Sequence, residues 1–328
     1  MDRDGFRAFL VDRDLADDQV DASLDIAEQF ETYLREEVPG TRSENATADV
    51  VNGFSQRMIE RGSNTWDHYV ALIRYGRFLG NDVVYVAALE LIDGAEALDT
   101  LHARLADEIG EAKRDAVFAG IDLPPLGMSN ASKPKLLETV MSRLQASVDP
   151  DTCLRILGGG LRYLEDGWYL DAKTKYEEAG GIDPYLEQKA AAFIAELEQH
   201  RDKETLYFNQ RINNDVIDYV RQHQEIASGV RQGTVLFEAK IPHQAIEYLN
   251  ASDPGDKAYH YCHCPWVKES LRGGASPIPA TFCHCSAAFH KKPYEVIFGR
   301  ALRADVVQSI LAGDLWCKFA IHLPEDVV

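Results

Sequence analysis

Four of the six cysteines in this chain lie in two matched triplets, residues 262–264 and 283–285, each of which reads Cys-His-Cys. Thiols and imidazoles bind transition metals, act as nucleophiles and form redox pairs. Such side chains are seldom clustered merely to fill a core. The two triplets therefore mark the candidate functional site, and Cys317 joins them from a later strand-like segment.

The triplets could bind a metal ion. If each triplet is extended, its two sulfurs point to one side and its histidine to the other, because side chains alternate along an extended backbone. Four thiolates could then bind zinc, although a ligand spacing of one residue is shorter than in common zinc modules. One sulfur from each triplet together with Cys317 is an alternative. The candidate metal ligands are Cys262, Cys264, Cys283, Cys285 and Cys317. Zinc is the expected metal, and an iron–sulfur cluster is a less favoured alternative.

The triplets could instead supply a nucleophile. Cys264 precedes Pro265, and proline favours the first position of a helix, so Cys264 is predicted to be the N-cap of a short helix. The helix dipole would lower the pKa of a thiol there. Glu269, five residues on, is predicted to be a general base on the same helix. The candidate catalytic residues are Cys264, Cys285, Glu269 and His290.

The charge of the chain limits its partners. The formal net charge is −19, which disfavours contact with nucleic acid and with anionic membrane surfaces. Between Asp256 and Arg303, however, basic residues outnumber acidic ones. This reversal indicates a site for an anionic small molecule, although a solvated surface with scattered lysines would have the same composition. The candidate substrate-binding residues are Arg272, Lys291, Lys292 and Trp266.

Apolar spacing predicts the elements that position these residues. Residues 1–118 carry successive apolar stripes at helical spacing, which predicts an acidic helical bundle. Residues 119–134 are rich in proline and small polar residues and are predicted to be a linker. Residues 135–328 are predicted to form the domain that binds ligand or metal. The helical N-terminal domain could pair subunits, so a homo-oligomer is an open expectation.

The C-terminal region mixes two periodicities. Residues 234–240 and 315–323 have strand character, the second with clean alternation of apolar residues. Helices are predicted at 135–144, 186–200, 214–226 and 301–311, the last ending at Gly313. The expected fold class is α+β, with an all-helical N-terminal bundle followed by a mixed α+β domain that contains an antiparallel sheet.

Residues 1–25 have no continuous apolar core of the kind typical of a signal peptide, and no apolar run is long enough to cross a bilayer. We therefore expect a cytoplasmic protein that does not bind membranes. In a reducing compartment, clustered cysteines favour metal binding or catalysis over structural disulfides.

Residues 205–324 resemble a superfamily that comprises the L-2-amino-thiazoline-4-carboxylic acid hydrolases and the 4-vinyl reductase domains. The resemblance rests on Cys264-Pro265, Cys285 and the ending Gly-Asp-Leu-Trp-Cys-Lys-Phe at 313–319. It implies an α+β ligand pocket. The hydrolase branch implies ring opening of a cyclic amidine carboxylic acid to carbamoyl-cysteine. The sensor branch implies an aromatic ligand beside a structural zinc bound by cysteines and a glutamate.

The chain departs from this superfamily in two ways. Sensor members often carry an acidic residue on the helix before the final cysteine, where this chain has Ser309. The simpler hydrolases lack counterparts of Cys262 and Cys283.

The first 118 residues resemble the SAM-like core-binding domain of tyrosine recombinases in the pattern Phe-Glu-Thr-Tyr-Leu at 30–34. The recombinase catalytic residues have no counterpart downstream.

These features predict a hydrolase that cleaves C–N bonds other than peptide bonds in a small, carboxylated, nitrogen-containing substrate. The attacking group would be a thiolate or a zinc-bound water. The alternative is a small-molecule-binding domain without turnover, in which the cysteines hold a structural zinc. A redox or cluster-bearing protein is a third hypothesis.

Overall fold

The structure is a computed structural model that describes residues 1–327, and it divides into two compact units. The first unit joins Met1–Ala95 to Asp122–Lys133, and the second joins Glu96–Ile121 to the chain from Pro134 onward. The division differs from the predicted boundary at 118/119. Two helices assigned by sequence to the N-terminal bundle, between residues 97 and 117, belong to the second unit.

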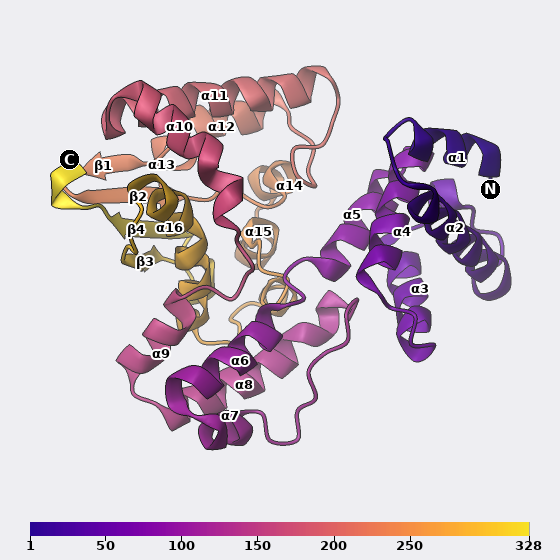
Figure 1. The fold of residues 1–328 in the computed structure, drawn as a ribbon, viewed down its shortest axis with the longest axis horizontal. Helices are drawn as coiled ribbons and strands as arrows, with labels where there is room; N and C mark the ends of the chain where they lie inside the picture. The colour runs from indigo at the N-terminus through magenta and orange to yellow at the C-terminus, as the bar shows by residue number, and fades with distance from the viewer. Residues whose placement is uncertain (328) are drawn as a thin grey trace. The chain divides into compact units, whose positions relative to one another are not determined.

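The first unit is a helical bundle built on amphipathic stripes (Figure 1). Phe6, Phe30 and Tyr75 are fully buried in its core. Asn81 caps one helix with its side-chain oxygen, and its amide nitrogen donates to the Ser43 carbonyl oxygen at 3.0 Å. The helices are α1 (Arg3–Val11), α2 (Asp17–Glu37), α3 (Ala48–Glu60), α4 (Trp66–Leu79) and α5 (Asp82–Ile92).

Much of the predicted linker is fixed to this bundle. The Ser55 hydroxyl donates to the Gly127 carbonyl oxygen at 2.8 Å, and the Asn64 amide donates to the Leu126 carbonyl oxygen at 2.9 Å. Gly127 has a φ of +85°, and a Cβ there would collide with the Tyr69 hydroxyl. The proline and glycine residues of this segment therefore belong to a stretch of chain that packs closely against the bundle.

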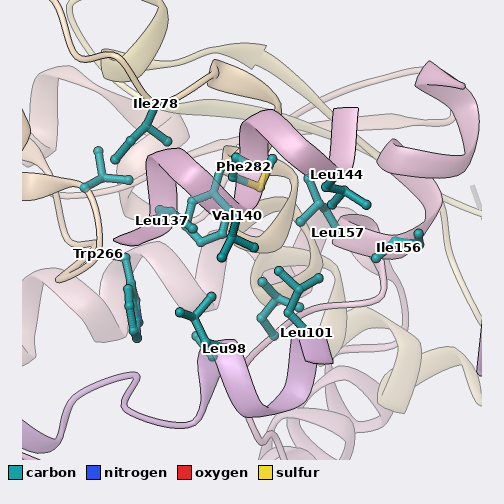
Figure 2. Close-up of a cluster of buried hydrophobic side chains, with 14 of the residues drawn as sticks. Leu98, Leu101, Leu137, Val140, Leu144, Ile156, Leu157, Trp266, Ile278 and Phe282 are labelled. Carbon is teal, nitrogen blue, oxygen red and sulfur yellow. The ribbon is translucent and has the colours of Figure 1, made fainter. Parts of the chain in front are cut away.

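The second unit contains the remaining helices and the sheet. Its helices are α6 (Ala97–Ile109), α7 (Glu111–Val117), α8 (Lys133–Ser147), α9 (Pro150–Gly158), α10 (Leu170–Ala179), α11 (Ile182–Asp202), α12 (Asn214–Gln222), α13 (Gln224–Ala227), α14 (Ala245–Asn250), α15 (Pro254–Tyr261) and α16 (His284–Phe298). The largest core joins α6, α8 and α9 to Trp266 and Phe282, which flank the triplets (Figure 2). The triplets are thus held by packing as well as by their local sequence.

The sheet has four antiparallel strands in the order β1-β2-β4-β3 (Figure 1). They are β1 (Val230–Gln232), β2 (Val235–Ala239), β3 (Ala304–Gln308) and β4 (Lys318–His322). The two central strands, β2 and β4, place Glu238 opposite Phe319. Helix α16 packs against β3 and β4, and Leu236, Tyr294 and Ile321 fill the core between helices and sheet.

The predicted α+β class with a mainly helical N-terminal part is confirmed. The helix predicted at 301–311 is wrong: residues 304–308 form β3, and Ile310–Ala312 form a short 3-10 turn. Pairing with β4 gives this segment backbone hydrogen bonds as a strand, and these stabilise it more than the weak helical spacing of its apolar residues favours a helix. Within residues 1–327, every helix is too short or too polar to cross a membrane.

Candidate functional site

The first triplet leaves helix α15 in an extended conformation. Cys262 is the C-cap of α15, with φ −70° and ψ 124°. His263 Nε2 lies 2.6 Å from the Ile241 carbonyl oxygen, to which the ring donates. Burial, reinforced by the charge of Lys240, lowers the pKa of His263 to about 3. This histidine is therefore neutral and fixed between two segments.

The chain after Cys264 forms tight turns in place of the predicted helix. The backbone N–H groups of Val267 and Lys268 both donate to the Cys264 carbonyl oxygen, at 3.1 and 2.9 Å. A 3-10 turn of four residues, Lys268–Leu271, then follows. A turn this short cannot supply the dipole of a regular helix. The predicted N-cap role of Cys264 is therefore wrong.

The second triplet is helical. Cys283 ends a 3-10 turn and precedes α16 with φ −65° and ψ −10°, while His284 and Cys285 belong to the first turn of α16. Successive helical residues are rotated by about 100°, so side chains two residues apart point to different sides. The second triplet therefore lacks the extended geometry that a four-thiolate site would require.

Tertiary hydrogen bonds bring the triplets near Cys317. The Tyr261 hydroxyl donates to the Lys240 carbonyl oxygen at 2.8 Å, and the Lys240 N–H donates to the Cys317 carbonyl oxygen at 3.4 Å. The Ser309 hydroxyl donates to Cys283 Sγ at 3.1 Å. The five thiols are close enough for their charges to interact, and none forms a disulfide.

Burial dominates the acidity of these thiols. It raises the pKa of Cys264 to about 12, with a further increase from Cys285. It also raises the pKa of Cys285, although the Leu161 N–H and the charges of Arg162, Lys240 and Arg104 act in the opposite direction. Since the thiol form prevails at neutral pH, the lowered pKa expected for Cys264 is wrong.

The thiols do not match the predicted zinc tetrahedron. In residues 1–327, no three His, Cys, Asp or Glu side chains are arranged so that they could hold a metal ion. The helical start of α16 accounts for this in part, because it directs Cys283 and Cys285 to different sides. As folded here, the five predicted ligands form a cluster of protonated thiols.

Two of the remaining predicted site residues lie together beside α15. Glu269 accepts from the Tyr259 hydroxyl at 3.1 Å and from Arg272 Nε at 3.0 Å. The Arg272 guanidinium also covers the Tyr259 ring at 3.5 Å. Trp266 is 2% exposed and belongs to the core of Figure 2. Glu269 and Arg272 thus neutralise each other, and Trp266 packs in the core.

The two lysines after His290 have partners of their own. Lys291 pairs with Glu295 at 2.9 Å and donates to the Leu302 carbonyl oxygen at the same distance. Lys292 pairs with Asp166. Both ammonium groups are therefore used within the fold.

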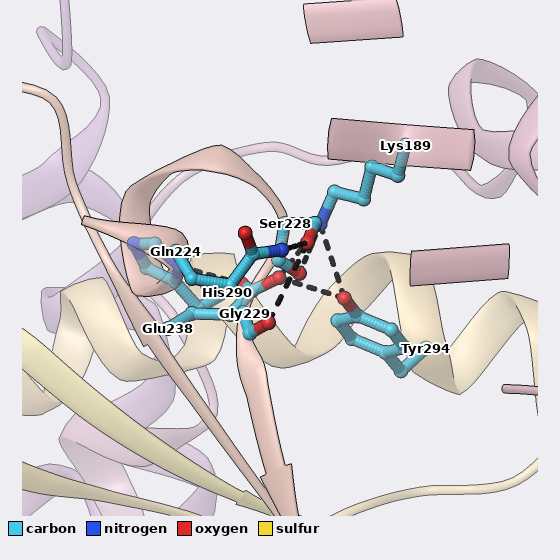
Figure 3. Close-up of polar contacts among 7 residues, drawn as sticks. All are labelled: Lys189, Gln224, Ser228, Gly229, Glu238, His290 and Tyr294. Carbon is cyan, nitrogen blue, oxygen red and sulfur yellow. Dashed lines mark hydrogen bonds and ion pairs between the residues drawn. The ribbon is translucent and has the colours of Figure 1, made fainter. Parts of the chain in front are cut away.

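A buried polar network surrounds Glu238 on β2 (Figure 3). One carboxylate oxygen accepts from Lys189 Nζ and from the Tyr294 hydroxyl, both at 2.7 Å. The other oxygen lies 2.9 Å from His290 Nδ1. Burial raises the pKa of Glu238, but Lys189 and His290 outweigh that effect and hold it at about 2. Glu238 is therefore an anion that orients His290.

His290 has its other ring nitrogen unused. Its side chain is 11% exposed, and its ring stacks on Phe319 with centroids 4.3 Å apart. Among residues 1–327, Nε2 is buried without a hydrogen-bond partner. Burial lowers the pKa of His290, and Glu238 offsets this only in part. At neutral pH, Nδ1–H donates to Glu238 and Nε2 carries a free lone pair.

Lys240 links this network to the thiols. It follows β2 directly, and its ammonium lies 5.6 Å from the ring of Phe289, the neighbour of His290. Burial has the largest effect on the pKa values of the groups near Lys240: it lowers those of the histidines and raises those of the thiols. The charge of Lys240 lowers the pKa values of both kinds of group, which are His263, His290, Cys264, Cys283, Cys285 and Cys317. Lys240 is therefore the common neighbour of His290 and the cysteine cluster.

Sequence reasoning identified His290 but missed Glu238, Lys240 and Lys189. A signal for Glu238 was present, because it is two residues from the buried Leu236 in a predicted strand and so lies on the same inner face. A carboxylate at such a position requires a partner. Lys189 lay within a predicted helix and carried no comparable signal.

Comparisons with known proteins return no match: no family model, curated protein or solved structure is similar to this chain. Assignment of a function therefore depends on the geometry of the site.

Proposed function

We propose that the second unit is a hydrolase that cleaves a C–N bond in a small carboxylated substrate, with His290 as the general base. The observation that carries the proposal is His290 itself: Glu238 holds Nδ1, while Nε2 is buried and has no partner among residues 1–327. A carboxylate that orients an imidazole in this way fixes its tautomer and stabilises the imidazolium that forms during proton transfer.

The proposed step uses water as the nucleophile. His290 Nε2 takes one proton from water as the water oxygen bonds to the substrate carbon. The C–N bond then breaks, and the leaving nitrogen takes the proton from Nε2, so the base is restored. Cyclic amidines that carry a carboxylate, the substrate type implied by the hydrolase resemblance, contain such a bond.

Water is favoured over the thiols on chemical grounds. Burial raises the pKa of Cys264 to about 12 and also raises that of Cys285, so little thiolate forms at neutral pH. The thiol, unlike the thiolate, is a poor nucleophile. In the proposed reaction, the cysteines surround the substrate without attacking it.

The test is a hydrolysis screen with the full chain. The panel contains 2-amino-thiazoline-4-carboxylate, other cyclic amidine carboxylates and ureido acids, with product detected by mass spectrometry. We expect His290→Gln and Glu238→Gln to reduce kcat by about 10²–10⁴-fold, the usual contribution of general-base catalysis. Full activity in His290→Gln, or no hydrolysis of any panel member, contradicts the proposal.

His284→Gln is the matched control. It makes the same change on the same helix, and His284 lies in the first turn of α16, outside the network of Figure 3. We expect its kcat to equal that of the unmodified protein. Equal losses in the two variants would mean that the effect comes from disturbing α16 in general.

A second candidate is a small-molecule-binding domain without turnover, in which the cysteines hold a structural zinc. The enclosed surroundings of the cluster favour it over a catalytic metal, because structural zinc sites are closed, and binding would require the thiols to lose their protons. Elemental analysis of untagged protein tests this candidate. About one zinc per chain, with a melting temperature that drops on chelation, would support it.

Six free thiols also fit the proposed cytoplasmic location.

A further inference from the structure

Lys240 lacks the ion pair that three other partly buried lysines of the second unit form. Lys189 pairs with Glu238 at 2.7 Å, Lys291 with Glu295 at 2.9 Å, and Lys318 with Glu225 at 3.1 Å. Within residues 1–327, the Lys240 ammonium has no such acceptor and lies 5.6 Å from the centre of the Phe289 ring. A partly buried cation with unused donors favours an anion as its ligand.

The groups around Lys240 do not neutralise it. His263 already donates from Nε2 to the Ile241 carbonyl oxygen at 2.6 Å. Glu238, two residues earlier on β2, already accepts from Lys189, Tyr294 and His290. These polar groups near Lys240 are therefore engaged with other partners.

The backbone of Lys240 is held on both sides. Its N–H donates to the Cys317 carbonyl oxygen at 3.4 Å, and its carbonyl oxygen accepts from the Tyr261 hydroxyl at 2.8 Å. These bonds tie the residue to the start of β4 and the end of α15. The ammonium therefore projects from a fixed point, as a binding residue should.

We propose that Lys240 binds the carboxylate of a small monoanionic ligand. A single ammonium matches a single negative charge. The inference deepens the proposed function and rests on it in one respect: binding at Lys240 would place the reacting carbon of the substrate near His290. Lys240 then takes the role that the sequence assigned to Arg272, Lys291 and Lys292.

The test is ligand binding without turnover, at constant ionic strength. Sodium benzoate and sodium acetate are titrated into the full chain, inorganic phosphate serves as the competing anion, and calorimetry and thermal shift report binding. We expect Lys240→Met to weaken benzoate binding by about tenfold or more. Lys203→Met, which removes an exposed lysine on the same unit, is the control and should bind as the unmodified protein does.

Three outcomes overturn the inference: unchanged benzoate affinity in Lys240→Met, no binding of either carboxylate to the unmodified protein, or binding of phosphate in preference to both. If Lys240→Met does not fold, Lys240→Arg replaces it and should retain binding. The deciding measurement is then the acylation of Lys240 in unmodified protein, followed by mass spectrometry. Saturating benzoate should protect Lys240 from acylation, and equal acylation with and without benzoate overturns the inference.

The two proposals fail in different ways. His290→Gln should keep its benzoate affinity and lose hydrolysis, because its effect is on the base. If Lys240→Met loses benzoate binding while His290→Gln stays fully active, the anion site stands and the proposed base is wrong. If His290→Gln is inactive while Lys240→Met binds benzoate normally, the proposed base stands and the anion site is wrong.

Discussion

The two Cys-His-Cys triplets have the same residues in the same order, yet they fold differently. The first leaves α15 in an extended conformation, and His263 donates to the Ile241 carbonyl oxygen at 2.6 Å. The second enters α16, with His284 and Cys285 in its first turn. The flanking sequence and packing decide the conformation, so the repeated triplet does not by itself create a symmetric four-thiol site.

The largest expected difference between the triplets is in stability. His263→Ala should lower the free energy of unfolding by roughly 2–4 kcal/mol, because it removes a buried ring and leaves the Ile241 carbonyl oxygen without its donor. His284→Ala should cost less than about 1 kcal/mol. Urea unfolding followed by circular dichroism measures both. Equal losses would mean that the two histidines are packed equivalently.

A smaller difference is expected between Cys262 and Cys285. Cys262→Ser should cost about 1–3 kcal/mol, because Cys262 is 8% exposed and a hydroxyl there is desolvated. Cys285→Ser should cost less, since the Leu161 N–H that contacts the sulfur can donate to the hydroxyl oxygen. The same urea experiment decides, and a larger loss in Cys285→Ser would reverse the comparison.

The pH dependence of stability should follow His263 more than His284. Burial lowers the pKa of His263 from its usual 6.5 to about 3, so the unfolded chain takes up a proton before the folded one does. Its contribution is complete above pH 6.5 and is lost as the pH falls towards 3. Melting temperatures across this window should decline less in His263→Ala than in His284→Ala. Parallel profiles would contradict the assignment.

The smallest expected difference is in thiol reactivity. Burial raises the pKa values of both Cys262 and Cys285, so both should alkylate slowly at pH 7. Cys285 should be the faster of the two, because the charges of Arg162, Lys240 and Arg104 favour its thiolate. Iodoacetamide labelling followed by peptide mass spectrometry measures both rates. Faster labelling of Cys262 would show that access of the reagent to the sulfur affects the rate more than the neighbouring positive charges do.

The sequence was most informative where periodicity is long. The helical stripes before residue 95, the strand character of residues 234–240 and the alternation in residues 315–323 correspond to elements of the structure. Short segments were less predictable. Residues 301–311 have helical spacing and yet form β3, because pairing with β4 supplies hydrogen bonds that local spacing does not reveal.

The sequence by itself determined which elements are amphipathic, the acidic charge of the chain and the presence of clustered thiols near His290. Only the tertiary structure decided how those thiols ionise and which partner orients His290. Glu238 and His290 lie 52 positions apart in the chain, and their hydrogen bond exists because α16 packs against the sheet. Periodicity records which face of an element is buried, whereas pKa values and hydrogen-bond partners depend on what is buried opposite that face.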